Sequence, residues 1–208
     1  MVDQIPAEKT DKKKRKNEAF YGYKIFVNKV ISKHISIYLS DGIGDGPEFI
    51  DMIHKIRSAN ENDIITIHLN TPGGYLETGM QIINAIRATD AHVITSLESR
   101  AYSLGTLIFL SGDELQIHEN CLMMFHHYSN LMYGKGHEIT AELEMINKWF
   151  NKILKKICVP FLSEEEVIEI QGGRDIWMDS DEIRKRLNKM TQEEQIERKP
   201  AKKKKKPR

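Results

Sequence analysis

The chain has 208 residues, which suits one domain with a sizeable core, or such a domain with tails. Hydrophobic residues make up 40% and charged residues 29%, as in an ordinary soluble globular protein. The longest apolar stretches, at 107–110 and 122–125, are too short to span a bilayer, and the polar residues 1–6 lack the apolar core of a signal peptide. We therefore expect a cytoplasmic protein without a membrane partner. Two cysteines, Cys121 and Cys158, make no disulfide framework and favour a reducing compartment.

Charge is distributed unevenly along the chain, although the net charge is only +1. Residues 198–208 carry eight basic side chains and no acidic one, and residues 1–17 carry six basic and three acidic ones. The body between them is therefore acidic, which is not the pattern of a nucleic-acid-binding domain, and we expect no nucleic-acid partner. We expect a disordered basic arm at 1–21, one domain at 22–188 and a disordered lysine-rich tail at 189–208.

The body alternates strand-like and helix-like segments, which predicts α/β architecture with parallel pairing. Apolar alternation, β-branched runs and capping residues give the boundaries. We expect strands at 35–39, 64–69, 93–97, 115–117 and 122–125. We expect helices over 49–56, 76–86 and 138–157, and another from near Ser103 to Gly112. Two further helices should start at the capping box of Ser163 and Glu166 and at Asp179 or Ser180.

The glycine pair at 73–74 follows the second strand and precedes a helix. Two glycines after a proline free the backbone, so that main-chain N–H groups at the helix start point into open space. Such groups bind negative charge, either a phosphate or a developing oxyanion. A plain tight turn is the alternative interpretation, and these residues alone do not exclude it.

Ser103 lies in a second strand–turn–helix segment, at the start of the helix, and Gly105 permits a close approach of the following turn. A serine at a helix start is often only an N-cap, while a nucleophile needs a base and an oxyanion site nearby. His126 and His127 end an apolar strand, and Asp175 is an isolated aspartate. Spacing along the chain cannot join these residues, because a catalytic triad is defined in space.

Four segments, in the same order, resemble those of the ClpP family, the proteolytic component of Clp proteases. Leu-Asn-Thr-Pro-Gly-Gly at 69–74 is similar to its Asn-Ser-Pro-Gly-Gly loop, and Ser-Arg-Ala-Tyr-Ser-Leu-Gly at 99–105 to its Gly-Gln-Ala-Ala-Ser-Met-Gly nucleophile segment. Asn-Cys-Leu-Met-Met-Phe-His at 120–126 is similar to its Asn-Ser-Arg-Val-Met-Ile-His segment. Gly-Arg-Asp-Ile-Trp-Met at 173–178 is similar to its Glu-Arg-Asp-Arg-Phe-Leu segment.

The resemblance implies a serine-type endopeptidase with a crotonase-like fold of repeated β-β-α units and a protruding long helix. It implies Ser103 as nucleophile, His126 as base and Asp175 as the residue that orients the histidine. The backbone N–H groups of Gly74 and Leu104 match the oxyanion hole. No cofactor is implied, and we expect no metal site, because the histidines are scattered and the cysteines lack ligand spacing.

The resemblance also implies a homo-oligomer of stacked heptameric rings, an AAA+ unfoldase as partner, and unfolded proteins or short peptides as substrates. The helix at 138–157 supports an oligomer, because it carries more apolar residues than one buried face needs, among them Met145, Trp149 and Phe150.

Two departures from the family bear on the site. Tyr102 replaces a small residue beside Ser103 and is expected to narrow the pocket, and residues 127–134 differ from the family's Gln-Pro and glycine pair. Three other functions remain open: a phage capsid maturation protease of the same family, acting in the host cytoplasm, a crotonase-like CoA-binding enzyme, and a scaffold subunit. The intact set of Ser103, His126 and Asp175 argues against the last two.

Overall fold

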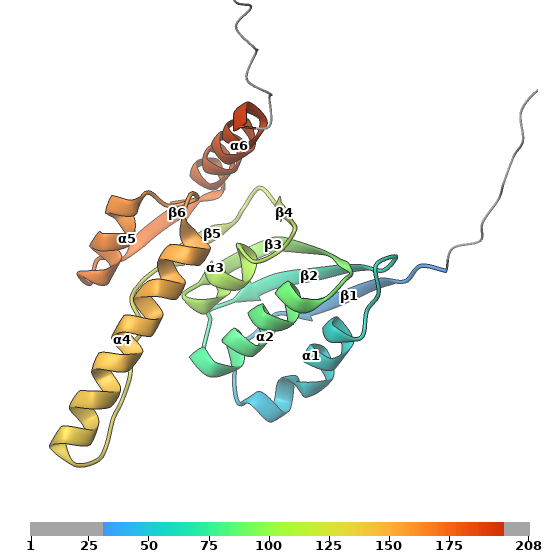
Figure 1. The fold of residues 1–208 in the computed structure, drawn as a ribbon. Helices are drawn as coiled ribbons and strands as arrows, with labels where there is room; N and C mark the ends of the chain where they lie inside the picture. Colours follow the sequence, from blue (N-terminus) through green and yellow to red (C-terminus); the bar gives the residue numbers. More distant parts are fainter. Residues whose placement is uncertain (1–30, 198–208) are drawn as a thin grey trace, which may run out of the picture. The chain divides into compact units, whose positions relative to one another are not determined.

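The computed structural model describes residues 31–197, and the expected disorder of the arm at 1–21 and of residues 198–208 lies outside these residues. Within these residues, six strands occur with helices between them, and Figure 1 shows their arrangement. In chain order the elements are β1 (His34–Leu39), η1 (Gly46–Phe49), α1 (Ile50–Arg57), β2 (Ile64–Thr71), α2 (Leu76–Ala88), β3 (His92–Tyr102), α3 (Leu104–Phe109), β4 (Glu114–Ile117), β5 (Leu122–Phe125), α4 (Gly136–Cys158), α5 (Glu164–Gln171), β6 (Ile176–Asp179) and α6 (Ser180–Glu197).

One six-stranded sheet organises the fold, in the order β1-β2-β3-β5-β6, with β4 also paired to β3. All pairs are parallel except β5 with β6, which is antiparallel. Strand β3 pairs with β4 along 94–97 and with β5 along 100–102, so its second half brings β5 beside it. The predicted α/β architecture with mostly parallel pairing is confirmed.

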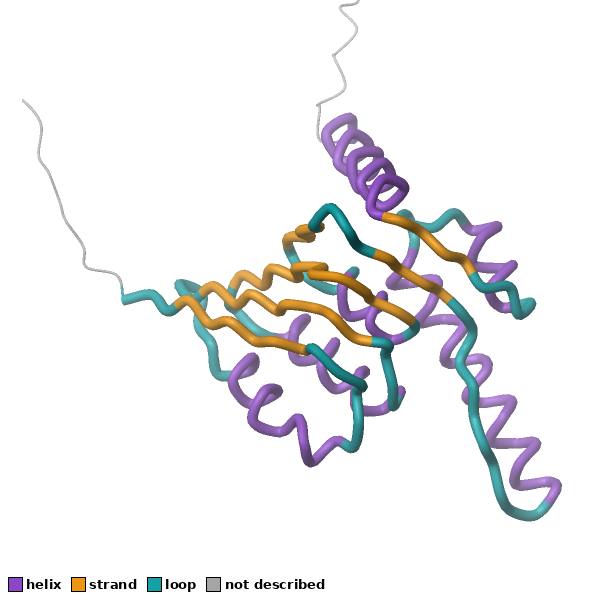
Figure 2. The backbone as a smooth tube through the Cα atoms, turned by 180° about the vertical axis from the view of Figure 1, so that it is seen from behind, coloured by secondary structure: helices purple, strands orange, loops and turns teal. Residues whose placement is uncertain are grey.

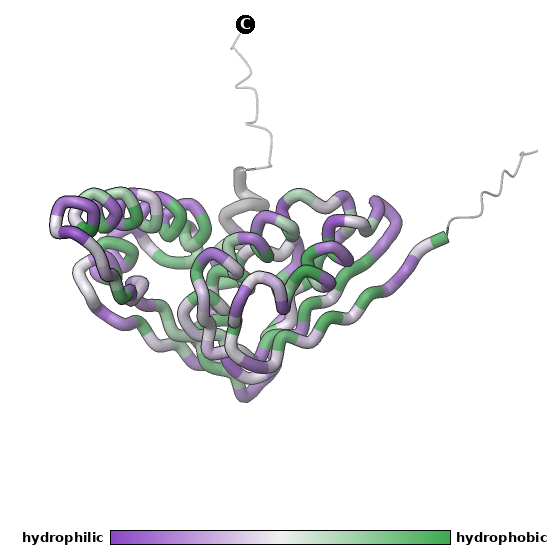
Figure 3. The backbone as a smooth tube through the Cα atoms, turned by 90° about the horizontal axis from the view of Figure 1, so that it is seen from below, coloured by the Kyte–Doolittle hydropathy of each residue, from purple (hydrophilic) through white to green (hydrophobic). Residues whose placement is uncertain are grey.

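The alternation of side chains explains where the core lies. In β2, Ile65, Ile67 and Leu69 are fully buried, while Ile64 and His68 on the other face are more accessible. The same alternation runs along β1, where hydrophobic and hydrophilic positions follow one another (Figure 3). Helices α1, α2 and α3 cover one face of the sheet (Figure 2), so the core forms between that face and the helices.

Three elements depart from the prediction: two in where they end, and one because it was not predicted at all. Strand β3 continues past 97 to Tyr102, because its second half gains β5 as a partner. Strand β6 was not predicted, since its four residues form a strand only through pairing with β5. Helix α6 continues to Glu197, so residues 189–197 are helical rather than part of a disordered tail. Met190 packs against the core there, as the next apolar position after Leu187 on the same helix face.

The predicted helix starts at 163 and 179 are confirmed. Ser163 accepts a hydrogen bond from the Glu166 amide, and Glu166 accepts one from the Ser163 amide, which completes the capping box. Asp179 accepts from the Glu182 amide at 3.0 Å at the start of α6. Within residues 31–197, no helix combines the length and the apolar character needed to span a membrane.

Candidate active site

Ser103 occupies a sharp turn between the end of β3 and the start of α3. Its backbone has φ 54° and ψ −122°, a conformation that costs about 1–3 kcal/mol for a residue with a side chain. The Ser103 amide donates to the carbonyl of Met124 on β5 at 2.8 Å, and the Ser103 carbonyl accepts from the Thr106 amide and hydroxyl. A strained serine at a strand–helix turn is the arrangement that exposes a nucleophilic hydroxyl at the edge of a sheet.

The glycine pair lies directly against this turn. Gly73 has φ 89°, and a β-carbon on it would lie 2.7 Å from the Tyr102 carbonyl oxygen and 2.9 Å from the Ser103 β-carbon. Only a residue without a β-carbon fits this position without displacing the serine. The tight-turn interpretation is therefore incomplete, because the turn is packed against Ser103.

The Gly74 amide points away from its neighbouring backbone. Ile43 donates to the Gly73 carbonyl at 2.9 Å and accepts from the Tyr75 amide at 2.7 Å, so the N–H of the residue between them faces the opposite side. Leu104 is the first residue of α3, where the amide has no partner within the helix. Among the described residues, neither the Gly74 amide nor the Leu104 amide donates a hydrogen bond.

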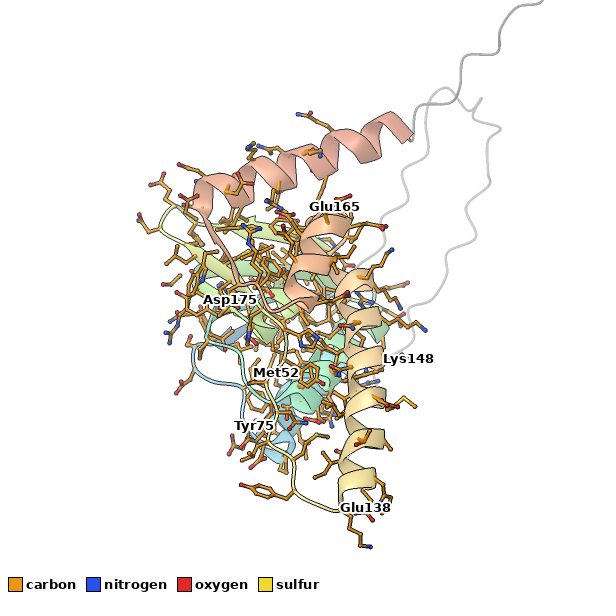
Figure 4. All side chains as sticks on the ribbon, turned by 90° about the vertical axis from the view of Figure 1, so that its left-hand side faces the viewer. Met52, Tyr75, Glu138, Lys148, Glu165 and Asp175 are labelled. Carbon is orange, nitrogen blue, oxygen red and sulfur yellow. The ribbon has the colours of Figure 1, made fainter. Side chains whose placement is uncertain are left out.

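His126 and Asp175 flank the antiparallel pair of β5 and β6. Phe125 pairs with Ile176, so one further step of the register places His126 opposite Asp175. His126 is half-buried, whereas Asp175 is exposed on the segment before β6 (Figure 4). No hydrogen bond joins Ser103, His126 and Asp175 within the described part of the chain. Catalytic hydrogen bonds are often long in unliganded sites and shorten when substrate binds.

A cavity of about 740 Å³ brings several predicted residues together. Ser103, His126, Gly74 and Leu104 all line it, while Asp175 and His127 do not. Its other walls come from α2, α3, α4 and the segment after β5, through Tyr75, Leu76, Glu77, Thr106, Leu107, Phe125, Tyr128, Ser129, Asn130, Leu131, Ile146, Trp149, Phe150 and Leu154. Such a mixture of apolar walls and a few convergent polar groups is typical of a ligand site.

Tyr102 does not line the cavity, so the expectation that it narrows the pocket is wrong. Its ring packs edge-on against Trp177 of β6, with ring centroids 5.2 Å apart, beneath the guanidinium of Arg100. The physical reason is the strand alternation of β3, which directs Tyr102 to the sheet face opposite the cavity.

The α4 wall of the cavity is the part that sequence reasoning missed. Ile146, Phe150 and Leu154 form one stripe at a spacing of four residues, and all three line the cavity. The spacing of these residues could be seen in the sequence. However, the apolar residues of this helix were interpreted as an oligomer interface and not as a wall of a ligand-binding cavity. Phe150, expected among the surplus apolar residues, is buried.

No group of three or more histidine, cysteine or acidic side chains within residues 31–197 is arranged to hold a metal ion. The two cysteines are buried and free. Burial raises the pKa of the Cys158 thiol to about 12 and raises that of Cys121 as well, so neither resembles an activated thiolate.

Comparison with known proteins identifies the family. The family model described as Clp protease matches residues 21–186. The chain is 24% identical over 150 residues to the ATP-dependent Clp protease proteolytic subunit 2 of Pseudomonas aeruginosa, which covers 70% of this chain and 74% of that protein. It is 31% identical over 135 residues to the protein of the same name from Chlamydia pneumoniae, covering 61% of this chain and 64% of the relative.

A third relative, again called ATP-dependent Clp protease proteolytic subunit 2, comes from Chlamydia trachomatis. It is 30% identical over 132 residues, and the match covers 61% of this chain and 64% of the relative. The chain thus spans less than two thirds of the length of the chlamydial relatives. The family match covers the four segments that carried the resemblance and most of the described fold, so this chain belongs to the Clp protease family.

Proposed function

We propose that the chain is a serine endopeptidase in which Ser103 attacks the carbonyl carbon of a peptide bond. His126 takes the proton of the Ser103 hydroxyl and later gives it to the leaving amine, and Asp175 holds the imidazole in the required tautomer. The observation that carries the proposal is the position of Ser103. It lies on a strained turn, beside two amides that have no partner among the described residues, in a cavity that His126 also lines.

The two amides supply the stabilisation that the reaction needs. As the serine oxygen bonds to the carbonyl carbon, negative charge develops on the carbonyl oxygen. The N–H groups of Gly74 and Leu104 can donate to that oxygen without breaking an existing hydrogen bond. Removal of one such donor typically costs a factor of about 10² to 10³ in kcat. Water then hydrolyses the acyl-enzyme, with His126 acting as base.

The third residue of the proposed site is Asp175. Asp175 precedes β6 and, one register step beyond the Phe125–Ile176 pair, lies opposite His126. A hydrogen bond from the His126 Nδ1–H to the Asp175 carboxylate would join the two side chains at this next position of the register. We infer that substrate binding or assembly brings the His126 imidazole and the Asp175 carboxylate together, because catalytic contacts are often loose in unliganded sites.

The names of the relatives support a proposal for the substrates and partners. The relatives are named as proteolytic subunits of an ATP-dependent Clp protease, which supports unfolded proteins and short peptides as substrates and an AAA+ unfoldase as the ATP-consuming partner. We propose that this chain works in a closed ring, with stacked heptamers as the expected form. Exposed apolar residues on α4, namely Leu143, Met145 and Trp149, support an assembly interface there.

The test is covalent labelling of the nucleophile. A fluorophosphonate probe should attach to Ser103 of the full chain, and Ser103→Ala should abolish both labelling and cleavage of a short peptide. The matched control is Ser99→Ala, an exposed serine on β3, which should leave both unchanged. Cleavage by Ser103→Ala at the wild-type rate would show that the nucleophile is wrong.

A further inference from the structure

Two consecutive residues after His126 are bonded to helix α4. The His127 Nε2 donates to the Asn151 Oδ1 at 3.1 Å, and the Tyr128 hydroxyl donates to the Asn147 Oδ1 at 2.8 Å. Asn147 and Asn151 lie one turn apart on the same face of α4. The segment that leaves β5 is therefore attached to two successive turns of the helix.

Aromatic packing fills the space between these two hydrogen bonds. The rings of His127 and Tyr128 lie 4.7 Å apart, and Phe150 meets both of them edge-on at 5.3 and 5.2 Å. Phe150 is only 4% exposed, whereas His127 and Tyr128 are half-buried, and their partial burial raises the pKa of the Tyr128 phenol. Edge-on aromatic pairs stabilise such a cluster beyond the burial of their area.

His126 itself lacks such anchoring. Within the described part of the chain its side chain makes no hydrogen bond, and its backbone follows the last residue of β5. Its position therefore depends on what holds the chain on either side. Strand β5 holds the preceding residues, and the contacts of His127 and Tyr128 with α4 hold the following ones.

We propose that His127 and Tyr128 are positioning residues that clamp the chain after His126 to α4, through Asn151 and Asn147, and so fix the imidazole relative to Ser103. The proposal rests on the proposed function of Ser103 and His126. Tyr128 and Phe150 also line the cavity, so the same clamp sets one of its walls. A looser clamp displaces the base, and because small displacements of a catalytic group are costly, kcat should fall more than KM rises.

A double-mutant cycle on the full chain tests the clamp. Tyr128→Phe removes only the hydroxyl, and Asn147→Ala removes the carboxamide whose Oδ1 accepts from it. Each should lower kcat on a short peptide roughly five- to tenfold, and lower the rate of fluorophosphonate labelling of Ser103 to the same extent. The double variant should be no worse than either single one, since one hydrogen bond is lost in all three. Asn147→Asp keeps an acceptor and should restore kcat.

The matched control is Tyr133→Phe, which removes a hydroxyl from a tyrosine that is 85% exposed in the same segment and should change nothing. Additive losses in the cycle, unchanged labelling rates, or an activity loss that accompanies dissociation of the assembly would overturn the clamp. Failure of the proposed function looks different, because wild-type Ser103 would then not be labelled at all. A labelled wild type with unaffected variants would refute the clamp alone.

Discussion

Gly73 and Ser103 are in direct contact, so the glycine loop and the serine turn form one unit. A β-carbon on Gly73 would approach the Ser103 β-carbon to 2.9 Å and the Leu104 amide nitrogen to 3.0 Å. Gly73 lies in a loop after β2 and Ser103 in a turn after β3, and these two strands are parallel neighbours in the sheet. The carboxyl ends of adjacent parallel strands meet at one edge, where ligand sites of α/β sheets form.

Gly73→Ala tests this contact. The substitution places a methyl group within 3 Å of backbone and side-chain atoms, at a φ of 89° that residues with side chains rarely adopt. We expect at least a hundredfold loss of kcat/KM, because the serine and its adjacent amide must shift. Stability should fall by about 1–3 kcal/mol. Peptide cleavage and denaturant unfolding measure the two effects, and wild-type activity in a folded alanine variant would refute the contact.

The two adjacent histidines should behave differently. His126 lines the cavity with Ser103, whereas the His127 imidazole is bonded to Asn151 of α4. His126→Ala should remove peptide cleavage and fluorophosphonate labelling by a factor of at least 10³, without unfolding the chain. His127→Ala should retain measurable cleavage, reduced about tenfold. The opposite order of effects would move the base to His127 and contradict the assigned roles.

Local patterns predicted most elements, but not the relationships that join the site. The helix at 164–171 followed from the capping box at Ser163, and β2 from its β-branched run, because both signals lie within a few residues. Strand β6 has no such signal, and the approach of Asp175 to His126 depends on its pairing with β5. The positive φ of Ser103 also depends on tertiary contacts, so only the family resemblance placed these residues in one site.

A partly buried ion pair between α5 and α6 predicts the response to acid. Arg186 donates to both carboxylate oxygens of Glu166 at 2.7 Å, and these hydrogen bonds hold the pKa of Glu166 below its usual value. A carboxyl with a lowered pKa in the folded state stabilises the fold above its unfolded pKa, near 4.3, and this contribution is lost as pH falls through the folded value. We expect the free energy of unfolding to decrease as the pH is lowered below about 4.5.

The variant Glu166→Gln isolates this pair, because the amide oxygen can still accept the capping hydrogen bond of Ser163. At pH 7 it should lower the free energy of unfolding by about 1.5–3 kcal/mol, the range for hydrogen bonds to charged groups. The difference from wild type should shrink below pH 4. Glu169→Gln on the same helix loses only an exposed pair with Arg174 and should cost less than about 1 kcal/mol. Equal effects of the two variants in urea unfolding would contradict the interpretation.

Helix α4 should control assembly through its outer face. Its inner stripe packs on the cavity and core, while Met145 is 66% exposed and does not line the cavity. Trp149, one turn further on, is 39% exposed and also lines the cavity. A lysine at 145 would place a charge in any apolar interface there, so Met145→Lys should shift the assembly toward the 24.1 kDa chain in sedimentation. Ile168→Lys is the matched control, since Ile168 on α5 is 64% exposed and the same charge is introduced away from α4. Its assembly should keep the wild-type mass.

A wild type that sediments as the single chain with full peptidase activity would show that the ring is not needed for cleavage. An intact assembly in Met145→Lys would place the interface on another face.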